Sequence, residues 1–325
     1  MAQPTLNSQH YDAVLTNISV AYMQAPDNYV ARRVFPVVGV DKQSGIYFKY
    51  NQGDWLRDEA KKRADATESA GSGYSTSTDN YQADVYAFHK DVGEQIVANA
   101  TSPLAPLTDA TKFVASRLLL RQEVDFATTY FKTGVWATDL TGHASTNTGS
   151  NFIQFSNYST STPIETIDRA KEYVVGVTGF EVNTMVVGKT VFNALKNHPA
   201  IIDRIKYTSS DVITEQILAR YFDVDNFLVA KAIRNTAAEG QADAISYLYS
   251  DGIFLCHAAS NPGLLTPSAG YTFAWNGITG SSGLDVGTYQ IPMPLAKATR
   301  IESQSAWVNK VVATNLGVFM NDVLA

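Results

Sequence analysis

The chain has 325 residues, and 45% of them are hydrophobic, so it can bury a sizeable core. Only 17% of the residues are charged, against a norm of about 25%. Ser, Thr, Asn and Gly take their place, which rules out a charge-driven disordered chain and indicates large surfaces covered by partners. The net charge of −6 argues against a strongly basic nucleic-acid-binding protein.

The positions of cysteine, lysine and arginine indicate in which compartment the protein folds and whether it carries a targeting segment. The single cysteine, Cys256, excludes an intrachain disulfide and a Cys-rich metal site, and it suits folding in a reducing compartment. No stretch approaches the roughly 18 consecutive apolar residues of a membrane helix. The first Lys or Arg is Arg32, so the N-terminus lacks the charged start of a signal peptide. We therefore expect neither export nor membrane insertion.

Residues 1–45 are predicted to form an extended arm, because prolines at 4, 26 and 36 interrupt a mixed polar and apolar segment. A short helix could cover Val14 to Met23, ending before Pro26. The segment Ala31 to Val40 is rich in Val and Phe and predicts a strand.

Residues 46–98 predict a long two-stranded hairpin, with Ile46 to Tyr50 as the outgoing strand and Tyr81 to Val92 as the return. A block of mixed charge lies between them: Arg57, Asp58, Glu59, Lys61, Lys62, Arg63, Asp65 and Glu68. A connection this long is usually functional or disordered. Composition favours a solvated tip, and the sharper alternative is a contact with opposite charges on a neighbouring subunit.

Thr108 to Phe131 is the clearest helix, with Thr108 as a candidate N-cap and a length of about 35 Å. Its apolar face is predicted from the spacing of Phe113, Leu120, Val124, Ala127 and Phe131. The Gly-, Ser- and Thr-rich segment 138–161 predicts a surface loop.

A second helix begins after Thr162, where Pro163 takes the first position and Glu165 completes a capping box. Its predicted apolar face comprises Ile164, Ile167, Ala170 and Val174.

From about residue 181 the pattern alternates between strands and helices. The predicted strands are Thr184–Val187, Asn226–Ala232, Gly252–Cys256 and Tyr271–Trp275, followed by Thr299–Ser305 and Lys310–Leu316 in the tail. The predicted helices are 189–197, Ala200–Ile205 and Thr214–Tyr221.

Several motifs resemble catalytic or binding sites, but each has a stronger structural interpretation. Gly188-Lys189-Thr190 looks like the end of a phosphate-binding loop, yet the glycine required five residues earlier is Asn183, which favours a strand-to-helix turn capped by Thr190. The five histidines lack metal-ligand spacing.

Other pairs of reactive residues are no stronger. Neighbours Cys256 and His257 would point to opposite faces of a strand, as a core cysteine and a packed or solvated histidine. Asp223 and Asp225 could bind a cation, but a solvated turn is favoured. Glu165 and Arg169 could pair on a helix surface. We predict no catalytic, cofactor-binding or metal-binding residue.

Five strings, taken in order, resemble those of one protein family. They are Asn28 to Pro36 (NYVARRVFP), Asp54 to Glu59 (DWLRDE), Asp109 to Phe113 (DATKF), Pro267 to Trp275 (PSAGYTFAW) and Thr299 to Glu302 (TRIE). With them, nearly the whole chain resembles the major capsid proteins of tailed bacteriophages, whose fold is named after Hong Kong phage ninety-seven.

The resemblance implies an α+β capsid fold in five parts. These are an N-terminal arm (1–45), an extended β-hairpin loop (46–98), a peripheral domain with a long spine helix (99–180), an axial α/β domain (181–294) and C-terminal strands that return to the peripheral domain (295–325). The arm and the hairpin have little core of their own, so they are expected to bury apolar residues on a neighbouring subunit. The arm begins almost at Met1, so scaffolding is expected to be separate or dispensable, and no crosslink from Lys61 or Lys62 is predicted.

The implied function is structural: self-assembly, as pentamers and hexamers, into the icosahedral head shell around packaged double-stranded DNA. The DNA would be contacted weakly and without sequence specificity. Scaffolding, portal and decoration proteins are candidate partners, and the product would belong to the virion after assembly in the host cytoplasm. The alternative within the fold is an encapsulin-like nanocompartment, and a distant one is an α/β enzyme using residues 181–294.

Overall fold

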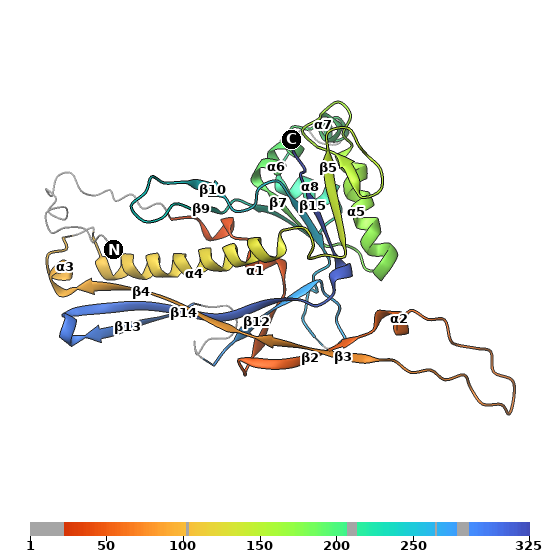
Figure 1. Cartoon of the computed structure of the whole chain (residues 1–325), viewed down its shortest axis with the longest axis horizontal. Coiled ribbons are helices and arrows are strands. Elements are labelled where there is room, and N and C mark those ends of the chain that lie inside the picture. Colours follow the sequence, from red (N-terminus) through yellow and green to blue (C-terminus); the bar gives the residue numbers. More distant parts are fainter. Residues whose placement is uncertain (1–22, 102–103, 207–212, 264, 278–285) are drawn as a thin grey trace.

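The computed structural model describes residues 23–101, 104–206, 213–263, 265–277 and 286–325. Apart from Met23, the helix predicted over Val14 to Met23 lies outside these residues. The described chain is built on a five-stranded sheet and a six-stranded sheet, with two separate two-stranded hairpins (Figure 1).

The five-stranded sheet carries the long helix α4 (Pro106–Tyr130) along one face (Figure 1). Its path runs β1-β12-β14-β13, and β4 also pairs with β14. The strands are β1 (Val37–Val40), β4 (Asp84–Gly93), β12 (Gly270–Trp275), β13 (Gly287–Met293) and β14 (Ala298–Val311). Short helices η2 (Pro26–Asn28), α3 (Glu94–Ala98) and η3 (Pro294–Ala296) lie in the connections.

Helix α4 confirms the predicted long helix, but its predicted cap and most of its predicted face are wrong. Pro106 occupies the first turn, and Thr108 lies inside the helix. The buried side includes Ala110, Val114, Leu118 and Phe126. The sequence has apolar residues on more than one side of this helix, so spacing alone cannot say which side the sheet covers.

The described arm lies in the core of its own chain, which corrects the expectation that it would need a neighbour for burial. Residues 31–34 form the helical turn α1 (Ala31–Val34), so the predicted strand over Ala31 to Val40 shrinks to β1. β1 pairs in parallel with β12. Phe35 is buried against Phe126, Tyr130 and Trp136, with ring centroids 5.3 to 6.3 Å apart. These aromatic contacts anchor the arm to α4.

The extended hairpin consists of β2 (Ser44–Tyr50) and β3 (Thr76–Gln82), with the one-turn helix α2 (Gln52–Trp55) after β2. The segment predicted as the return strand, Tyr81 to Val92, is confirmed as strand apart from Ala83, but its role as the partner of β2 is wrong beyond Gln82. The Ala83 N–H donates to the Gln43 carbonyl at 2.8 Å, and beyond this point the chain changes partner and becomes β4. β4 pairs antiparallel with β14 over ten residues, so distant pairing decides the register.

The six-stranded sheet has the order β6-β5-β15-β11-β7-β8. Its strands are β5 (Thr138–His143), β6 (Asn151–Ile153), β7 (Thr184–Gly188), β8 (Asn226–Ala230), β11 (Ile253–Cys256) and β15 (Gly317–Asn321). The accompanying helices are α5 (Pro163–Thr178), α6 (Lys189–Lys196), α7 (Pro199–Lys206), α8 (Glu215–Tyr221) and η4 (Thr314–Leu316). The hairpin of β9 (Ile233–Asn235) and β10 (Ile245–Tyr247) extends from this layer.

Helix α5 confirms both the predicted start after Thr162 and the predicted face, since Ile164, Ile167, Ala170 and Val174 are all buried. The surface loop predicted over 138–161 is wrong in part, because it contains β5 and β6. These two short strands are rich in polar residues, so the sequence pattern does not indicate them. They pair in parallel with each other, and β5 also pairs in parallel with β15.

The sheets divide the chain differently from the ranges expected for the peripheral and axial domains. β5 and β6, from 99–180, belong to the six-stranded sheet, whereas β12 and β13, from 181–294, belong to the five-stranded sheet. The tail is also split: β14 is in the five-stranded sheet and β15 pairs with β11. The chain passes between the layers repeatedly, which contiguous ranges do not capture.

Candidate assembly surface

The hairpin β2–β3 has one covered face and one open face. Tyr47 and Tyr81 turn toward Phe273 of β12, with ring centroids 5.6 and 4.5 Å away. Alternation along the strand therefore directs Ile46 and Phe48 away from the molecule. Their side chains are 69% and 68% exposed.

Small polar residues of β3 lie opposite this apolar pair, Asn80 beside Ile46 and Thr78 beside Phe48. They are too small to cover it. We call Ile46, Phe48 and Tyr50 the hairpin stripe.

An aromatic cluster extends the stripe toward the tip. The rings of Tyr50, Trp55 and Tyr74 lie 5.7 to 6.1 Å apart, and all three residues are exposed. Leu56 is exposed next to them. Contiguous apolar surface of this kind usually marks an interaction site. The alternating apolar residues at 46, 48 and 50 were the signal in the sequence, but nothing there said which side would be open.

Two local networks hold the base of the hairpin. Gln52 Nε2 donates to the Val177 carbonyl at the end of α5 at 2.5 Å, and Gln52 Oε1 accepts from Asn315 at 3.3 Å. The carboxylate of Asp54 accepts from the backbone N–H and the hydroxyl of Ser75 at 2.9 and 2.6 Å. These bonds, with a smaller effect of nearby Arg57, lower the pKa of Asp54.

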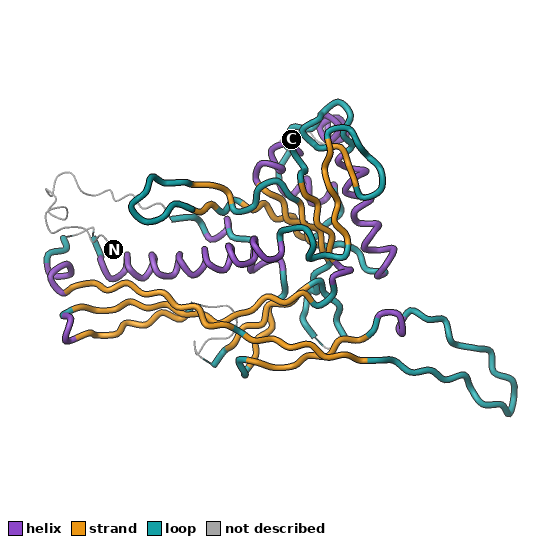
Figure 2. The backbone as a smooth tube through the Cα atoms, in the orientation of Figure 1, coloured by secondary structure: helices purple, strands orange, loops and turns teal. Residues whose placement is uncertain are grey.

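The predicted charged residues lie beyond this base, in a tip that projects from the molecule (Figure 2). Arg57 forms ion pairs within its own chain, at 3.3 Å with Asp54 and 3.9 Å with Glu59. The other six are exposed and form no ion pair with any described residue: Asp58, Lys61, Lys62, Arg63, Asp65 and Glu68. The structure thus places the eight predicted charges on one loop and leaves these six without an ion pair in the described chain.

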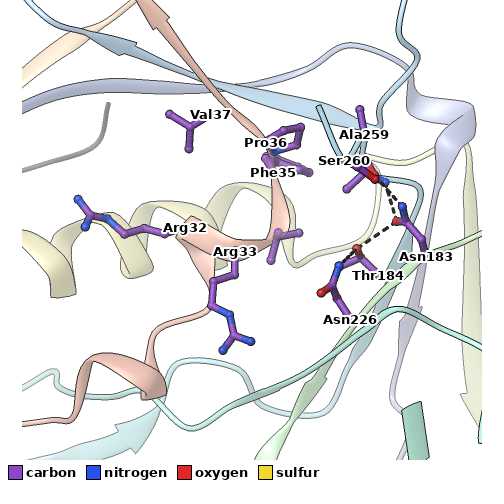
Figure 3. Close-up of a pocket in the computed structure, with 12 residues that line it drawn as sticks. Arg32, Arg33, Phe35, Pro36, Val37, Asn183, Thr184, Asn226, Ala259 and Ser260 are labelled. Carbon is purple, nitrogen blue, oxygen red and sulfur yellow. Dashed lines mark hydrogen bonds between the residues drawn. The ribbon is translucent and has the colours of Figure 1, made fainter. Parts of the chain in front are cut away.

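A shallow pocket between the arm and the edge of the six-stranded sheet holds no catalytic group. Figure 3 shows Arg33 on one side, and Asn183, Asn226 and Ser260 on the other. None of the lining residues is Asp, Glu, His or Cys. The Asn183 amide is occupied by the backbone of Ala258, with bonds of 2.7 and 2.9 Å. The pocket lining therefore offers no carboxylate, imidazole or thiol that could act as a base or activate the hydroxyls of Thr184 and Ser260.

The other reactive residues singled out in the sequence have structural roles. Cys256 is fully buried, which raises its pKa, and His257 bonds the Glu181 carbonyl through Nδ1 at 2.7 Å. Buried His198 accepts the Ala200 N–H at Nδ1, so its Nε2 carries the proton that is shared with Ser161 at 2.9 Å. That polarity is opposite to the one that activates a serine.

The turn at Gly188 is packed tightly against the backbone of residue 250. A Cβ on Gly188 would lie 2.3 Å from the Ser250 carbonyl oxygen, to which Thr190 also donates at 3.1 Å. The predicted strand-to-helix turn is confirmed, but Gly188 rather than Thr190 is the N-cap of α6.

Among the carboxylates outside the hairpin, Glu165 has a different partner from the ones expected. Glu165 pairs with Arg204 at 3.2 Å, so neither the predicted capping box nor the pair with Arg169 forms. Asp223 lies 4.0 Å from Lys171 in a turn.

Across the described ranges, no three His, Cys, Asp or Glu residues lie close enough together to hold a metal ion. Within the same ranges, no helix has the length and apolar character of a membrane span.

Comparison with known proteins agrees with this geometry. Residues 146–273 match the family model described as phage major capsid protein E. A curated relative, the major capsid protein of Burkholderia phage BcepMu, is 27% identical over 229 residues, which cover 68% of this chain and 69% of the relative. The chain is thus similar in sequence to phage major capsid proteins.

Solved structures support the capsid fold. A phage-related protein from Bordetella bronchiseptica RB50 matches with a TM-score of 0.65 at 19% identity, covering 91% of this chain and 92% of the other. The capsid structure of cyanophage P-SCSP1u matches with a TM-score of 0.56 at 10% identity, covering 98% and 95%. The chain has the α+β fold of these capsids, which is named after Hong Kong phage ninety-seven. The matched family and the curated relative are structural capsid proteins and not enzymes.

Proposed function

We propose that the chain self-assembles, as pentamers and hexamers, into the closed icosahedral shell of a tailed-phage head. The observation that carries the proposal is the open hairpin stripe with its aromatic cluster, on a hairpin that projects away from the rest of the chain (Figure 1). Burying one large apolar side chain is worth roughly 1.5–3 kcal/mol. A neighbouring copy that covered the stripe would gain this at every equivalent interface.

The eight charged residues of the hairpin are proposed as further contacts between subunits: Arg57, Asp58, Glu59, Lys61, Lys62, Arg63, Asp65 and Glu68. Each exposed pair contributes only about 0–1 kcal/mol. Apolar burial would therefore supply most of the affinity, and the charges would select the register of the contact.

The shell would enclose packaged double-stranded DNA, which we propose is contacted weakly and without sequence specificity. The net charge of −6 supports this, because it leaves no surplus of phosphate-neutralising side chains. Assembly in the host cytoplasm, with scaffolding, portal and decoration proteins as partners, belongs to the same proposal. The family match supports a phage shell over an encapsulin-like compartment.

Light scattering and electron microscopy of the purified chain test the proposal, with phage partners co-expressed if the chain alone stays small. We expect large closed particles. Replacing residues 58–73 by a short Gly-containing turn should leave a folded subunit that closes no shells. The replacement stops at Gly73 because β3 begins at Thr76. A stable monomer at all concentrations, even with partners, would contradict the proposal.

A further inference from the structure

We propose that residues 18–22 dock, as an extended segment, on the apolar face of the β9–β10 hairpin of the same chain. These residues precede Met23, where the described part of the chain begins. The contact lies outside the surfaces proposed for shell assembly, and it gives a role to exposed apolar residues that those surfaces do not include.

The β9–β10 hairpin has an open apolar face. Ile245 and Tyr247 lie two residues apart on β10, so their side chains point to the same side, and Tyr247 lies directly opposite Ile233 of β9. Ile245 is 63% exposed and Tyr247 is 46% exposed. The other side of the hairpin turns toward the molecule at its base, where Ala232 is buried and Leu248 packs against the main core. The described residues therefore leave the apolar face open.

A two-stranded hairpin of this kind needs further cover. Among the described residues, β9 and β10 pair only with each other. Two strands alone are marginally stable in water, and a third strand or a packed face is what stabilises them. An exposed apolar edge is also a template on which other chains aggregate. A further segment on the open face would stabilise the hairpin and protect the subunit from unspecific association.

The arm reaches the β9–β10 hairpin at Gln24. Its side-chain amide bridges one residue of β9: Gln24 Nε2 donates to the Ile233 carbonyl at 2.7 Å, and Gln24 Oε1 accepts the Ile233 N–H at 2.9 Å. The amide thus makes the two bonds that a neighbouring antiparallel strand would make at this edge of β9. The residues before Met23 therefore continue from the border of the open apolar face.

The sequence before Met23 alternates as such a contact requires. Ile18, Val20 and Tyr22 are separated by Ser19 and Ala21, a pattern that is typical of a strand with one apolar side. A helix over the same residues, which the sequence analysis considered, would turn the side chains of Ile18 and Val20 about 200° apart. Only an extended segment brings the three large side chains to one surface.

Reach and charge both favour the segment of the same chain. Four residues separate Val20 from Gln24, so an extended chain between them spans up to about 14 Å. Ile245 lies one strand across and two residues along from Ile233, which is a distance of about 8 Å. A tether this short corresponds to an effective concentration in the millimolar range, which favours it over another copy. Residues 18–22 carry no charge, so the contact is apolar.

Cysteine pairs test the contact in the full-length, unassembled subunit. V20C is combined with I245C or with Y247C on the apolar face. The matched control combines V20C with S246C, on the opposite face of the same strand. Native Cys256 is fully buried, so it does not compete. After addition of diamide, we expect the faster of the two face pairs to close an intrachain disulfide at least about tenfold faster than the control. Equal rates on the two faces, or disulfides only between chains, would overturn the proposal.

Limited proteolysis of two charge variants gives a second test that needs no cysteine. Val20→Asp places a charge in the apolar contact, whereas Ser19→Asp places the same charge one residue earlier, on the side that faces away from the hairpin. We expect Val20→Asp to speed removal of the residues before Met23 by proteinase K about tenfold, and Ser19→Asp to change it by less than about twofold. Thermal melting checks that both variants fold. Equal rates for the two variants would overturn the proposal, whether or not the subunit forms shells.

Discussion

The carboxylate of Glu123 is a single buried group that ties the arm to the long helix. Its side chain is 1% exposed, and its two oxygens accept the backbone N–H groups of Val30 and Ala31, each at 2.9 Å. Burial raises the pKa of Glu123, while the two backbone bonds oppose the shift. The arm enters the core at this point, so its path depends on one side chain of α4.

Replacing this carboxylate should loosen the arm. Glu123→Ala leaves two buried donors without acceptors, and we expect it to lower the free energy of unfolding by about 2–4 kcal/mol. Glu123→Gln keeps one good acceptor and should cost about half as much. Urea unfolding of the unassembled subunit measures both. Equal stability of the Ala variant and the wild type would mean that Phe35 and its neighbours hold the arm without this bond.

Asp251 makes stability depend on pH. Burial, with the nearby charge of Asp322, raises its pKa from 3.8 to about 6, although it accepts the Leu324 N–H at 2.7 Å. The folded state therefore binds more protons than the unfolded state between these values, so the free energy of unfolding should fall as pH rises from 4 to 6. Because the Asp251 carboxyl is partly exposed to solvent, we expect this decrease in the free energy of unfolding to be only about 1 kcal/mol.

Asp251→Asn keeps an acceptor for Leu324 but does not titrate, so this decrease should be missing from its stability curve. The comparison must be made between variants, because His198 has the opposite effect on stability. Burial lowers the pKa of His198, so its contribution reduces the free energy of unfolding as the pH falls below 6.5. Parallel curves for wild type and Asp251→Asn across pH 4–6 would remove Asp251 as the source.

At the scale of elements, helix α4 shows how burial and apolar character separate. Phe126 is fully buried among Phe35 and Tyr130. Phe113, on the same helix, is 37% exposed, with the cationic groups of Lys90 and Arg117 5.4 and 5.0 Å from its ring centroid. Two phenylalanines of one helix thus have different roles, one in the core and one under surface cations.

This difference predicts unequal losses of stability. Phe126→Ala should cost about 3–5 kcal/mol, because it leaves a cavity in the core. Phe113→Ala should cost about 1 kcal/mol, mostly from lost contact with the two cations. Thermal or urea unfolding of the two variants, matched in chemistry and helix, gives the comparison. Similar losses at both positions would contradict the packing described for α4.

At the scale of the whole molecule, the subunit holds its arm inside and leaves its hairpin outside. Phe35 is buried in its own chain, whereas Ile46 and Phe48 face away from it. The isolated subunit gains little from the exposed hairpin stripe, whereas in the proposed shell its burial would stabilise the contact between copies.

The double variant Ile46→Ser with Phe48→Ser tests that division. Folding of the unassembled subunit should change by less than about 0.5 kcal/mol, because neither side chain is buried there. Particle yield should fall sharply, and high salt should not restore it, because the lost contact is apolar. A variant with reversed charges in the hairpin loop, K61E with K62E and R63E, provides the contrast. Its loss of particle yield should become smaller as the salt concentration rises. Normal yield from the double variant would exclude the stripe from the interface.

Local pattern in the sequence determined the elements whose signals lie within a few residues. The start and buried face of α5, and the strand β7 with its turn into α6, followed from local sequence. Spacing also predicted the long helix around Phe113, although not its cap or most of its buried face. The order of five strings along the chain indicated the capsid family. The absence of a nucleophile, metal pair or phosphate loop in the sequence pointed to a structural protein, which the family match supports.

Tertiary structure alone decided which side of each element is covered and which distant strand it joins. Spacing places Phe113 on a helix, but it is packing against Phe35 of the distant arm that makes Phe126, and not Phe113, a core residue of that helix. The chain changes partner at Ala83 because β14, more than 200 residues away, pairs with the segment that follows. The stripe is open because the other face of the hairpin, with Tyr47 and Tyr81, packs against Phe273. Burial and pairing are contacts between residues far apart in the chain, and a local pattern carries no information about them.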